Sequence, residues 1–437
     1  MCLPAASAAG FSFAGLPVGA IMKKEFPLSR QRRGLCRAKT GHKGDATKVK
    51  RSDAPAPLLI KNADLYDPAP QGITSLLILG GRIAQICPDL DERSIRSVLP
   101  DLVVMDVSGA RTLPGLIDGH NHFAGAGGEG GFQFRTPPAQ LTDFTRSGIT
   151  TAVGLLGTDG YNRSLEDLLA KSRALDAEGL STWIFTGSYQ LPGPNLCGST
   201  ARDICLIDKV IGCKIALSDH RSSHPSAEAL RSLVSSVRVS AMLAGKRGVV
   251  CVHMGSEETG LEPLREALRG TDVPKTQFLP THVGRCEDLT RDAVRWVREG
   301  GAADITASDE AASRFGQFVV AGADVSRVTL TSDGNGSMPV FNEEKELVGM
   351  GVGSPSSILK TIGDIVTGGV ADLTTAVSLA TKNPAALLGL PGKGSLKPGF
   401  DADCLVLNDD WTVRSVVARG VPAVWDGKIL VRGTYER

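Results

Sequence analysis

The sequence predicts a (β/α)8 barrel, TIM-like in form, with a small β domain assembled from both ends of the chain. Short apolar runs alternate with helix-like segments from residue 114 to residue 390, and strand-rich pieces stand before and after them. Continuously apolar strands are typical of a parallel sheet covered on its faces by helices. About eight such strand–helix units favour a closed barrel over an open doubly wound sheet.

The small β domain is predicted from residues 58–113 and 394–437. The first piece contains the runs LLIKNADLYDP, SLLILGGRIAQI and VVMDVSGARTLPG, and the second begins GSLKPGFDADCLVLNDDW. Both pieces consist of short alternating strands that end at Gly or Asp turns. We therefore expect the two ends of the chain to pair in one β-sandwich.

The barrel is predicted over residues 114–393. Its first strand precedes the pair His120 and His122, and further strands are expected in TTAVGLL, STWIFTG, VIGCKIAL, GVVCVHM, QFLPTHV, GAADITA and RVTLTSD. Helices are expected over residues 164–179, 288–301 and 373–390. The sequence contains no GxxxxGK[ST] motif, and its GxGxxG match at residues 125–130 lies in a glycine-rich loop with no helix-like segment directly after it. Nucleotide-binding folds therefore lose their usual support.

Composition narrows the function classes. The 437 residues carry a formal charge of +1, which argues against general attraction to nucleic acid or anionic membranes. No apolar run approaches the roughly 20 residues that span a bilayer. The nine cysteines form no CxxC pair, and we expect buried, reduced thiols; Cys213 and Cys251 are expected in the core, facing away from the site.

Residues 1–57 differ from the rest of the chain. They are basic and contain only three carboxylates, Glu25, Asp45 and Asp53. Such a composition is typical of a transit peptide or a disordered extension. We expect a cytoplasmic protein, or a plastid or mitochondrial one if this segment is a transit peptide.

Chemistry-bearing residues stand at the carboxyl ends of the predicted strands, which meet on one face of a barrel. Four of the seven histidines do so, and an aspartate follows the last strand. Residues two apart on a strand point to the same side, so His120 and His122 can bind one ion. The strand-end residues, His120, His122, His253, His282 and Asp333, therefore predict a metal site.

Lys214 lies inside the apolar run VIGCKIAL. An ammonium in that position is costly unless it is paired or neutral. A neutral amine can react with CO2 to give a carbamate, an anionic ligand able to bridge two metal ions. The other interpretation is an ion pair between Lys214 and Asp333 or Asp219.

These positions resemble the binuclear, carboxylated-lysine subtype of the amidohydrolase superfamily. The segments GGEGGFQFRTP, FTGSYQLPG, LPTHVGR and SDGNGSMP further resemble the isoaspartyl dipeptidase family, the β-aspartyl peptidases among the metallopeptidases. The similarity covers residue 58 to the C-terminus.

The resemblance implies two Zn2+ ions per chain and a role for each residue. His120 and His122 would bind one ion and His253 and His282 the other. Carboxylated Lys214 would bridge them, with Asp333 as ligand and proton shuttle and Tyr189 as a catalytic group. The implied substrate contacts are Gly127, Gly128, Glu129, Thr158, Tyr189, Arg221, Arg285 and Ser337.

The implied function is hydrolysis of β-aspartyl dipeptides in the degradation of isoaspartyl-damaged proteins. Such a dipeptide carries an α-ammonium, which suits Glu129, and two carboxylates, which suit Arg221 and Arg285. Arg135 is expected in a rim ion pair. The family resemblance also implies a homo-oligomer, with no nucleic-acid or membrane partner.

Two other functions stay open at this point. One is a cyclic amide hydrolase of the same subtype, such as a dihydroorotase or hydantoinase, in which Glu129 would lack a role. The other is a non-catalytic scaffold, which is disfavoured because every ligand position is filled.

Overall fold

The computed structural model describes residues 55–344 and 346–437. The extension expected over residues 1–57 therefore lies, apart from its last three residues, outside the described part. Within that part, none of the helices combines the length and the apolar character needed to cross a bilayer.

A closed ring of parallel strands forms the centre of the fold. Strands β6 to β11 pair in sequence order in one six-stranded sheet, and β12 pairs with β13. Strand β11 contacts β12 and β13 contacts β6, which closes the ring and confirms the predicted barrel. The strands are β6 Leu116–Asn121, β7 Ile149–Gly154, β8 Ser181–Gly187, β9 Val210–Leu217, β10 Val249–Met254, β11 Phe278–Thr281, β12 Ala303–Thr306 and β13 Val328–Thr331.

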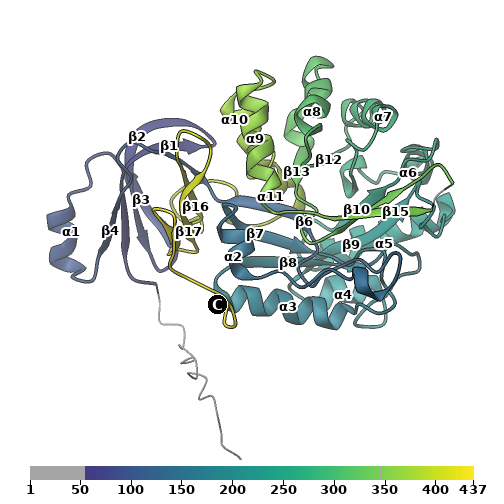
Figure 1. The fold of residues 1–437 in the computed structure, drawn as a ribbon, viewed down its shortest axis with the longest axis horizontal. Coiled ribbons are helices and arrows are strands. Elements are labelled where there is room, and N and C mark those ends of the chain that lie inside the picture. The colour runs from purple at the N-terminus through teal and green to yellow at the C-terminus, as the bar shows by residue number, and fades with distance from the viewer. Residues whose placement is uncertain (1–54, 345) are drawn as a thin grey trace, which may run out of the picture. The chain divides into compact units, whose positions relative to one another are not determined.

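One or more helices follow each barrel strand, because each crossover must return the chain to the same end of the sheet. Figure 1 shows α3 and α4 outside β8 and β9. Two further strands, β14 Ser337–Phe341 and β15 Leu347–Val352, form a hairpin after β13. The helices are α2 Leu141–Thr145, α3 Leu165–Glu178, α4 Thr200–Leu206, α5 Ala227–Leu243, α6 Glu262–Leu268, α7 Glu287–Arg298, α8 Ala311–Val320 and α9 Ser357–Thr367.

The prediction of a single helix over residues 373–390 is wrong. Two helices stand there instead, α10 Leu373–Ser378 and α11 Lys382–Leu388. Pro384 has no amide hydrogen and fits only the first turn of a helix. A new helix must therefore begin just before it, after the break at residues 379–381.

Both ends of the chain share one mixed sheet of nine strands, as expected. Strand β5 joins the two ends, because it pairs with β1 on one side and with β16 on the other. A separate apolar core packs against this sheet. The elements are β1 Leu58–Asp67, β2 Ala69–Leu79, β3 Arg82–Cys87, α1 Glu92–Val98, β4 Val103–Asp106, β5 Arg111–Pro114, β16 Cys404–Leu407, β17 Val413–Ala418, β18 Val421–Trp425 and β19 Lys428–Ile429.

A buried ammonium connects the barrel with this sheet. Nζ of Lys393 lies 2.6 Å from Asp403 Oδ2 and 2.9 Å from Asp401 Oδ2. It also donates to the Ser181 hydroxyl at the start of β8, at 2.6 Å. The side chain of Lys393 is only 2% exposed, so water cannot replace these partners.

We expect Lys393→Met to lower the free energy of unfolding by about 3–5 kcal/mol, because it leaves carboxylates without their buried partner. The exposed Lys360, which pairs with Asp309 and Asp364 at the surface, is the matched control, and Lys360→Met should cost less than about 1 kcal/mol. Denaturant unfolding of both variants measures the difference. Equal losses would show that the buried contact has no special weight.

Candidate active site

The predicted ligand residues meet at the carboxyl ends of the barrel strands. His120 lies at the end of β6, Lys214 within β9 and His253 within β10. His282 directly follows β11, and Asp333 lies two residues after β13. His122 follows β6. The four imidazoles and the lysine are buried, and Asp333 is largely so.

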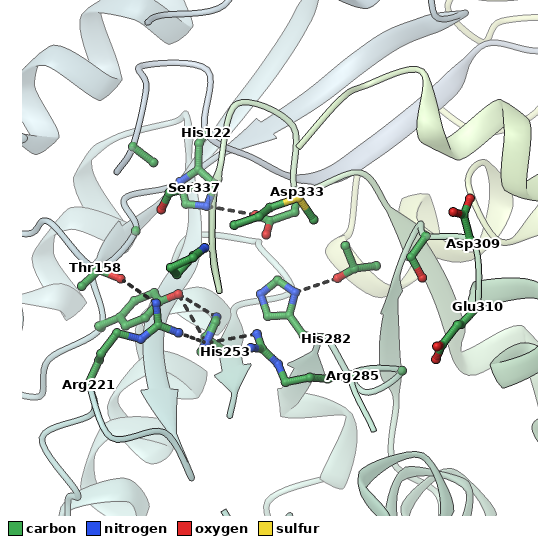
Figure 2. A pocket seen from close by; sticks show the side chains of 18 residues that line it. His122, Thr158, Arg221, His253, His282, Arg285, Asp309, Glu310, Asp333 and Ser337 are labelled. Atoms are coloured by element: carbon green, nitrogen blue, oxygen red, sulfur yellow. Dashed lines mark hydrogen bonds and ion pairs between the residues drawn. The ribbon is translucent and has the colours of Figure 1, made fainter. Parts of the chain in front are cut away.

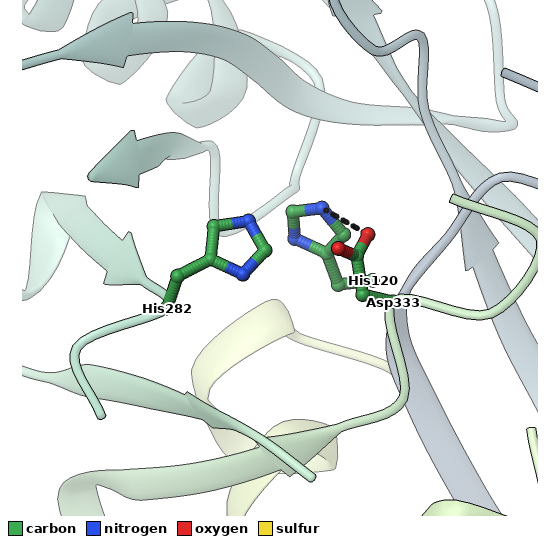
Figure 3. Close-up of side chains that lie close together, drawn as sticks. All are labelled: His120, His282 and Asp333. Carbon is green, nitrogen blue, oxygen red and sulfur yellow. Dashed lines mark ion pairs between the residues drawn. The ribbon is translucent and has the colours of Figure 1, made fainter. Parts of the chain in front are cut away.

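Three of these side chains form the tightest group. The ligand atoms of His120, His282 and Asp333 all lie within 4.8 Å of one another (Figure 3). The other two imidazoles extend the group: Nε2 of His122 lies 3.1 Å from Asp333 Oδ1, and the ring centroid of His253 lies 4.5 Å from that of His282. The structure thus brings all the predicted ligand side chains together in one cluster.

The backbone at two of these residues is strained. His282 and Asp333 have φ angles of +63° and +50°, a left-handed conformation that residues other than glycine rarely adopt. Such strain is kept where the surrounding structure over-determines it, and it gathers at functional sites. The turn after each strand thereby aims its side chain back over the mouth of the barrel.

Burial keeps the imidazoles of His120, His253 and His282 neutral. It lowers the pKa of His120 and His282 well below the usual value, and that of His253 to about 3. Burial alone would raise the pKa of Asp333, but the hydrogen bond from His122 and the nearby charges hold it below the ordinary value. Neutral imidazoles and an ionised carboxylate are the forms that bind divalent cations.

Lys214 makes no ion pair with a carboxylate among the described residues, so neither Asp333 nor Asp219 neutralises it there. Its Nζ lies 3.1 Å from Nε2 of His120. Burial lowers the pKa of the ammonium, which favours the neutral amine. The side chain ends inside the cluster, within reach of the same space as the imidazoles.

The donor set fits a metal centre. Nδ1 of His122 is buried and has no hydrogen-bond partner among the described residues. Burying an unpaired polar atom costs free energy, and a cation bound nearby would compensate for that cost. Imidazole nitrogens and carboxylate oxygens are the common protein ligands of zinc. The cluster therefore suits a metal site formed by His120, His282 and Asp333, with Lys214 beside it.

A cavity of about 500 Å3 opens over the cluster (Figure 2). The imidazoles of His122, His253 and His282 reach it from below, and other predicted residues form its wall. The wall residues from the prediction are Thr158, Tyr189, Arg221, Arg285, Asp333 and Ser337, with Thr306, Ser308, Asp309, Glu310, Met338 and Pro339 among those that the prediction did not include.

Glu129 stands beside the cavity and faces two of its wall residues. Its Oε1 lies 3.3 Å from Nη1 of Arg221, and its Oε2 accepts a hydrogen bond of 3.0 Å from the Ser337 hydroxyl. Nη1 of Arg221 also lies 3.4 Å from the Thr158 hydroxyl. A carboxylate and a guanidinium therefore lie beside one another at the edge of the cavity.

Glycines shape the loop that carries Glu129. Gly127 and Gly128 have φ angles of +81° and +114°, which an L side chain rarely adopts. A Cβ on Gly127 would lie 2.3 Å from the carbonyl oxygen of Phe134, so no larger residue fits. Arg135, further along the loop, pairs with Asp159 at 2.8 Å, which confirms the expected rim ion pair.

The Tyr189 hydroxyl lies within the cluster rather than at its rim. It is 2.8 Å from Nδ1 of His253, and the two rings lie 4.4 Å apart. Burial raises the pKa of the phenol, so the hydroxyl keeps its proton near neutral pH. It is therefore available as a hydrogen-bond donor over the metal ligands.

Two polar residues that orient the site were missed by the sequence reasoning. Asp219 accepts two hydrogen bonds of 2.9 Å from the guanidinium of Arg221 and lies 3.1 Å from Nε2 of His253. The Thr306 hydroxyl lies 2.6 Å from Nδ1 of His282. Asp219 lies just after β9 and Thr306 at the end of β12. These positions could have indicated a role in the site, because strand ends on this face supply the other site residues.

The expectation that Cys251 faces away from the site is wrong. Cys251 and His253 stand two residues apart on β10, and such residues point to the same side of a strand. The Cys251 sulfur lies 3.7 Å from Nδ1 of His120 and 3.9 Å from Nζ of Lys214. Burial raises the pKa of this thiol to about 11, so it lies beneath the cluster as a neutral group.

Comparisons with known proteins agree with this geometry. A family model described as the amidohydrolase family matches residues 227–429. A crystal structure of the β-aspartyl dipeptidase of Fervidobacterium islandicum AW-1 in complex with β-Asp-Leu is 38% identical, covers 86% of this chain and 98% of that chain, and has a TM-score of 0.82.

More distant proteins share less. The L-hydantoinase of Arthrobacter aurescens is 16% identical over 86% of this chain and 98% of its own, with a TM-score of 0.58, a likeness of fold alone. The curated adenine deaminase of Methanothrix thermoacetophila is 38% identical over 58 residues, which span 13% of this chain and only 10% of that protein. Identity of 38% across almost the whole of the Fervidobacterium enzyme decides the family: this chain belongs to the β-aspartyl dipeptidases of the amidohydrolase family.

Proposed function

We propose that the protein hydrolyses β-aspartyl dipeptides with the help of two zinc ions, and so degrades fragments of isoaspartyl-damaged proteins. The observation that carries this proposal is the placement of Glu129, whose carboxylate is held by Arg221 and Ser337 beside a cavity over the ligand cluster. A β-aspartyl unit presents both an α-ammonium and an α-carboxylate there. The related enzyme from Fervidobacterium was crystallised with β-Asp-Leu.

Each charge of the dipeptide has a counterpart in the cavity. Glu129 would bind the α-ammonium, and Arg221 and Arg285 would bind the two carboxylates. Thr158 and Ser337 would add hydrogen bonds, and the backbone of Gly127 and Gly128 would approach the substrate closely. Asp219 keeps the Arg221 guanidinium in a fixed orientation, which reduces the entropy lost on binding.

The metal ligands follow the same division. His120 and His122 would hold one zinc ion, and His253 and His282 the other. Carboxylated Lys214 would bridge the two ions, and Asp333 would complete the set. Bound zinc supplies Lewis acidity and lowers the pKa of water toward neutrality.

The residues of the chain supply the proton transfers and the charge stabilisation. Asp333 is ionised, so it accepts a proton from the water that attacks the side-chain-linked amide carbonyl. The Tyr189 hydroxyl, which keeps its proton, donates a hydrogen bond to the oxyanion that develops on that carbonyl. Asp333 then delivers its proton to the departing amine, which breaks the amide bond.

The direct test is a comparison of substrates with the zinc-loaded protein. We expect turnover of β-Asp-Leu and at most weak turnover of α-Asp-Leu, hydantoin and dihydroorotate, because only the β-aspartyl unit presents its ammonium to Glu129. Preferential hydrolysis of a cyclic amide would favour the hydantoinase-like alternative. Lack of hydrolysis of any of the four by zinc-loaded protein would overturn the proposed function.

Replacing Glu129 by Gln should raise KM for β-Asp-Leu and leave zinc content unchanged. A hydrogen bond to a charged group contributes about 1.5–3 kcal/mol, so we expect kcat/KM to fall by about 10- to 100-fold. Glu257→Gln is the matched control, because Glu257 pairs with His224 at an exposed site. If Glu129→Gln behaved like this control, Glu129 would have no part in binding.

Replacing Tyr189 by Phe should lower kcat by about 100- to 1000-fold, as the loss of one oxyanion donor does. Zinc content, measured by elemental mass spectrometry, should stay at the wild-type value. Tyr161→Phe, at a side chain 83% exposed, serves as control and should leave kcat unchanged. Wild-type turnover in the Tyr189 variant would remove the phenol from the mechanism.

A further inference from the structure

The loop that carries Glu129 presents a physical problem. Gly127, Gly128, Gly130 and Gly131 surround this residue, and all four have positive φ angles. Glycine has more conformational freedom than any other residue, so such a loop loses much entropy when it is held in one conformation. A carboxylate in its middle can select a substrate ammonium only if something outside the loop fixes the backbone.

Arg163 provides such a fixing group. It directly precedes Ser164, whose side chain caps the first turn of α3, so its backbone is anchored in the barrel. Its guanidinium donates to the carbonyl oxygens of Ala124 at 2.8 Å, Ala126 at 3.0 Å and Thr136 at 2.8 Å. Ala124 and Ala126 lie on the outgoing arm of the glycine loop and Thr136 on the returning arm.

We propose that Arg163 is a positioning residue, which clamps the two arms of the glycine loop and so holds Glu129 at the substrate ammonium. This inference rests on the proposed function of Glu129. No carboxylate of the described residues forms an ion pair with Arg163, so its partners are backbone carbonyls. The planar guanidinium of arginine spreads its donors over a rigid fork, whereas lysine has all its donors on one nitrogen at the end of a flexible stem, so lysine would not reproduce this arrangement of contacts at both arms.

The contacts around Arg163 also extend to the loop of Ser337, whose hydroxyl donates a hydrogen bond to Glu129. The Thr136 hydroxyl accepts a hydrogen bond of 2.7 Å from the amide of Ala126 and donates one of 2.6 Å to the carbonyl of Asn335. Asn335 lies two residues before Ser337, the residue that donates to Glu129. Arg163 and Thr136 thus connect the loop of Glu129 with the loop that follows β13.

The Arg163 guanidinium packs directly against the backbone of Gly125. A Cβ on Gly125 would lie 2.8 Å from Nη1 and 2.9 Å from Nη2 of Arg163. The glycine is therefore what lets the arginine approach the loop from inside. The guanidinium is partly buried, and its charge-assisted hydrogen bonds are stronger than neutral ones, which suits a clamp.

A matched control exists elsewhere in the barrel. Arg231 on α5 donates to the carbonyl oxygens of Ala267, Glu266 and Arg269, at 3.0, 3.3 and 3.3 Å, around the end of α6. It binds three carbonyls as Arg163 does, but it takes no part in the cavity wall. Arg231→Lys therefore reports the cost of losing such a clamp where no substrate is bound.

The test is a double-mutant cycle with β-Asp-Leu on zinc-loaded protein. Arg163→Lys should raise KM by about tenfold and leave kcat within about twofold, whereas in the Glu129→Gln background it should change kcat/KM by less than about twofold. Arg231→Lys should change neither constant. An equal loss in both backgrounds, or an unchanged KM in the wild-type background, would overturn the positioning role while leaving the proposed function intact.

Two readouts keep the test decisive. Amide hydrogen exchange of residues 124–136 should accelerate in Arg163→Lys and stay unchanged in Arg231→Lys. If Arg163→Lys does not fold, Thr136→Val removes the hydroxyl contacts to Ala126 and Asn335 but keeps the carbonyl that Arg163 binds. It loosens the same pair of arms through a different contact and should show the same Glu129-dependent rise in KM. Wild-type protein that does not turn over β-Asp-Leu would instead overturn the proposed function, and this inference with it.

Discussion

The structure is organised around one buried collection of metal-binding groups at the carboxyl ends of the barrel strands. Four imidazoles, one amine and one carboxylate share a space from which water is largely excluded. Uncompensated polar groups in such a setting cost several kcal/mol each. Divalent cations would stabilise this group of side chains, because neutral imidazoles offer lone pairs and the carboxylate offers negative charge. The strained backbone at His282 and Asp333 belongs to the same arrangement, because both residues supply side chains to the cluster.

In the proposed function, substrate selection depends on a second layer of contacts beside that cluster. Glu129 gains its position from Arg221 and Ser337, which reach it from different strand ends. Asp219 links the two layers, since it touches both the Arg221 guanidinium and the His253 imidazole. In the proposed function, Asp219 would therefore hold the charges that bind a zwitterionic dipeptide in a fixed position relative to the groups that cleave it. A hydantoin has no ammonium group that could bind to the Glu129 carboxylate.

Much of this could be predicted from the sequence, because apolar strands and strand-end positions follow simple periodicities. The runs that end at His253 and His282 identify barrel strands, and the barrel topology then brings their ends together. The same periodicity was misapplied at Cys251, which shares a strand face with His253. The break between α10 and α11 was signalled by Pro384, although the apolar pattern runs through it.

Contacts that join segments far apart in the chain could not be predicted in this way. Arg163 lies 27 to 39 positions from the carbonyls that it binds, and nothing in its local sequence marks it. Thr306 stands out only once β12 is placed beside β11. Lys393 similarly derives its importance from Ser181, 212 positions away. Hydrogen bonds to backbone carbonyls leave no residue pattern, so they emerge only from the folded arrangement.

The most direct test of the account is a crystal structure of the zinc-loaded protein with anomalous data at the zinc edge. We expect two anomalous peaks, one beside His120 and His122 and one beside His253 and His282. We also expect electron density for a carboxyl group on Nζ of Lys214 between the two peaks. A single peak, or an unmodified lysine side chain in the zinc-loaded protein, would contradict the account.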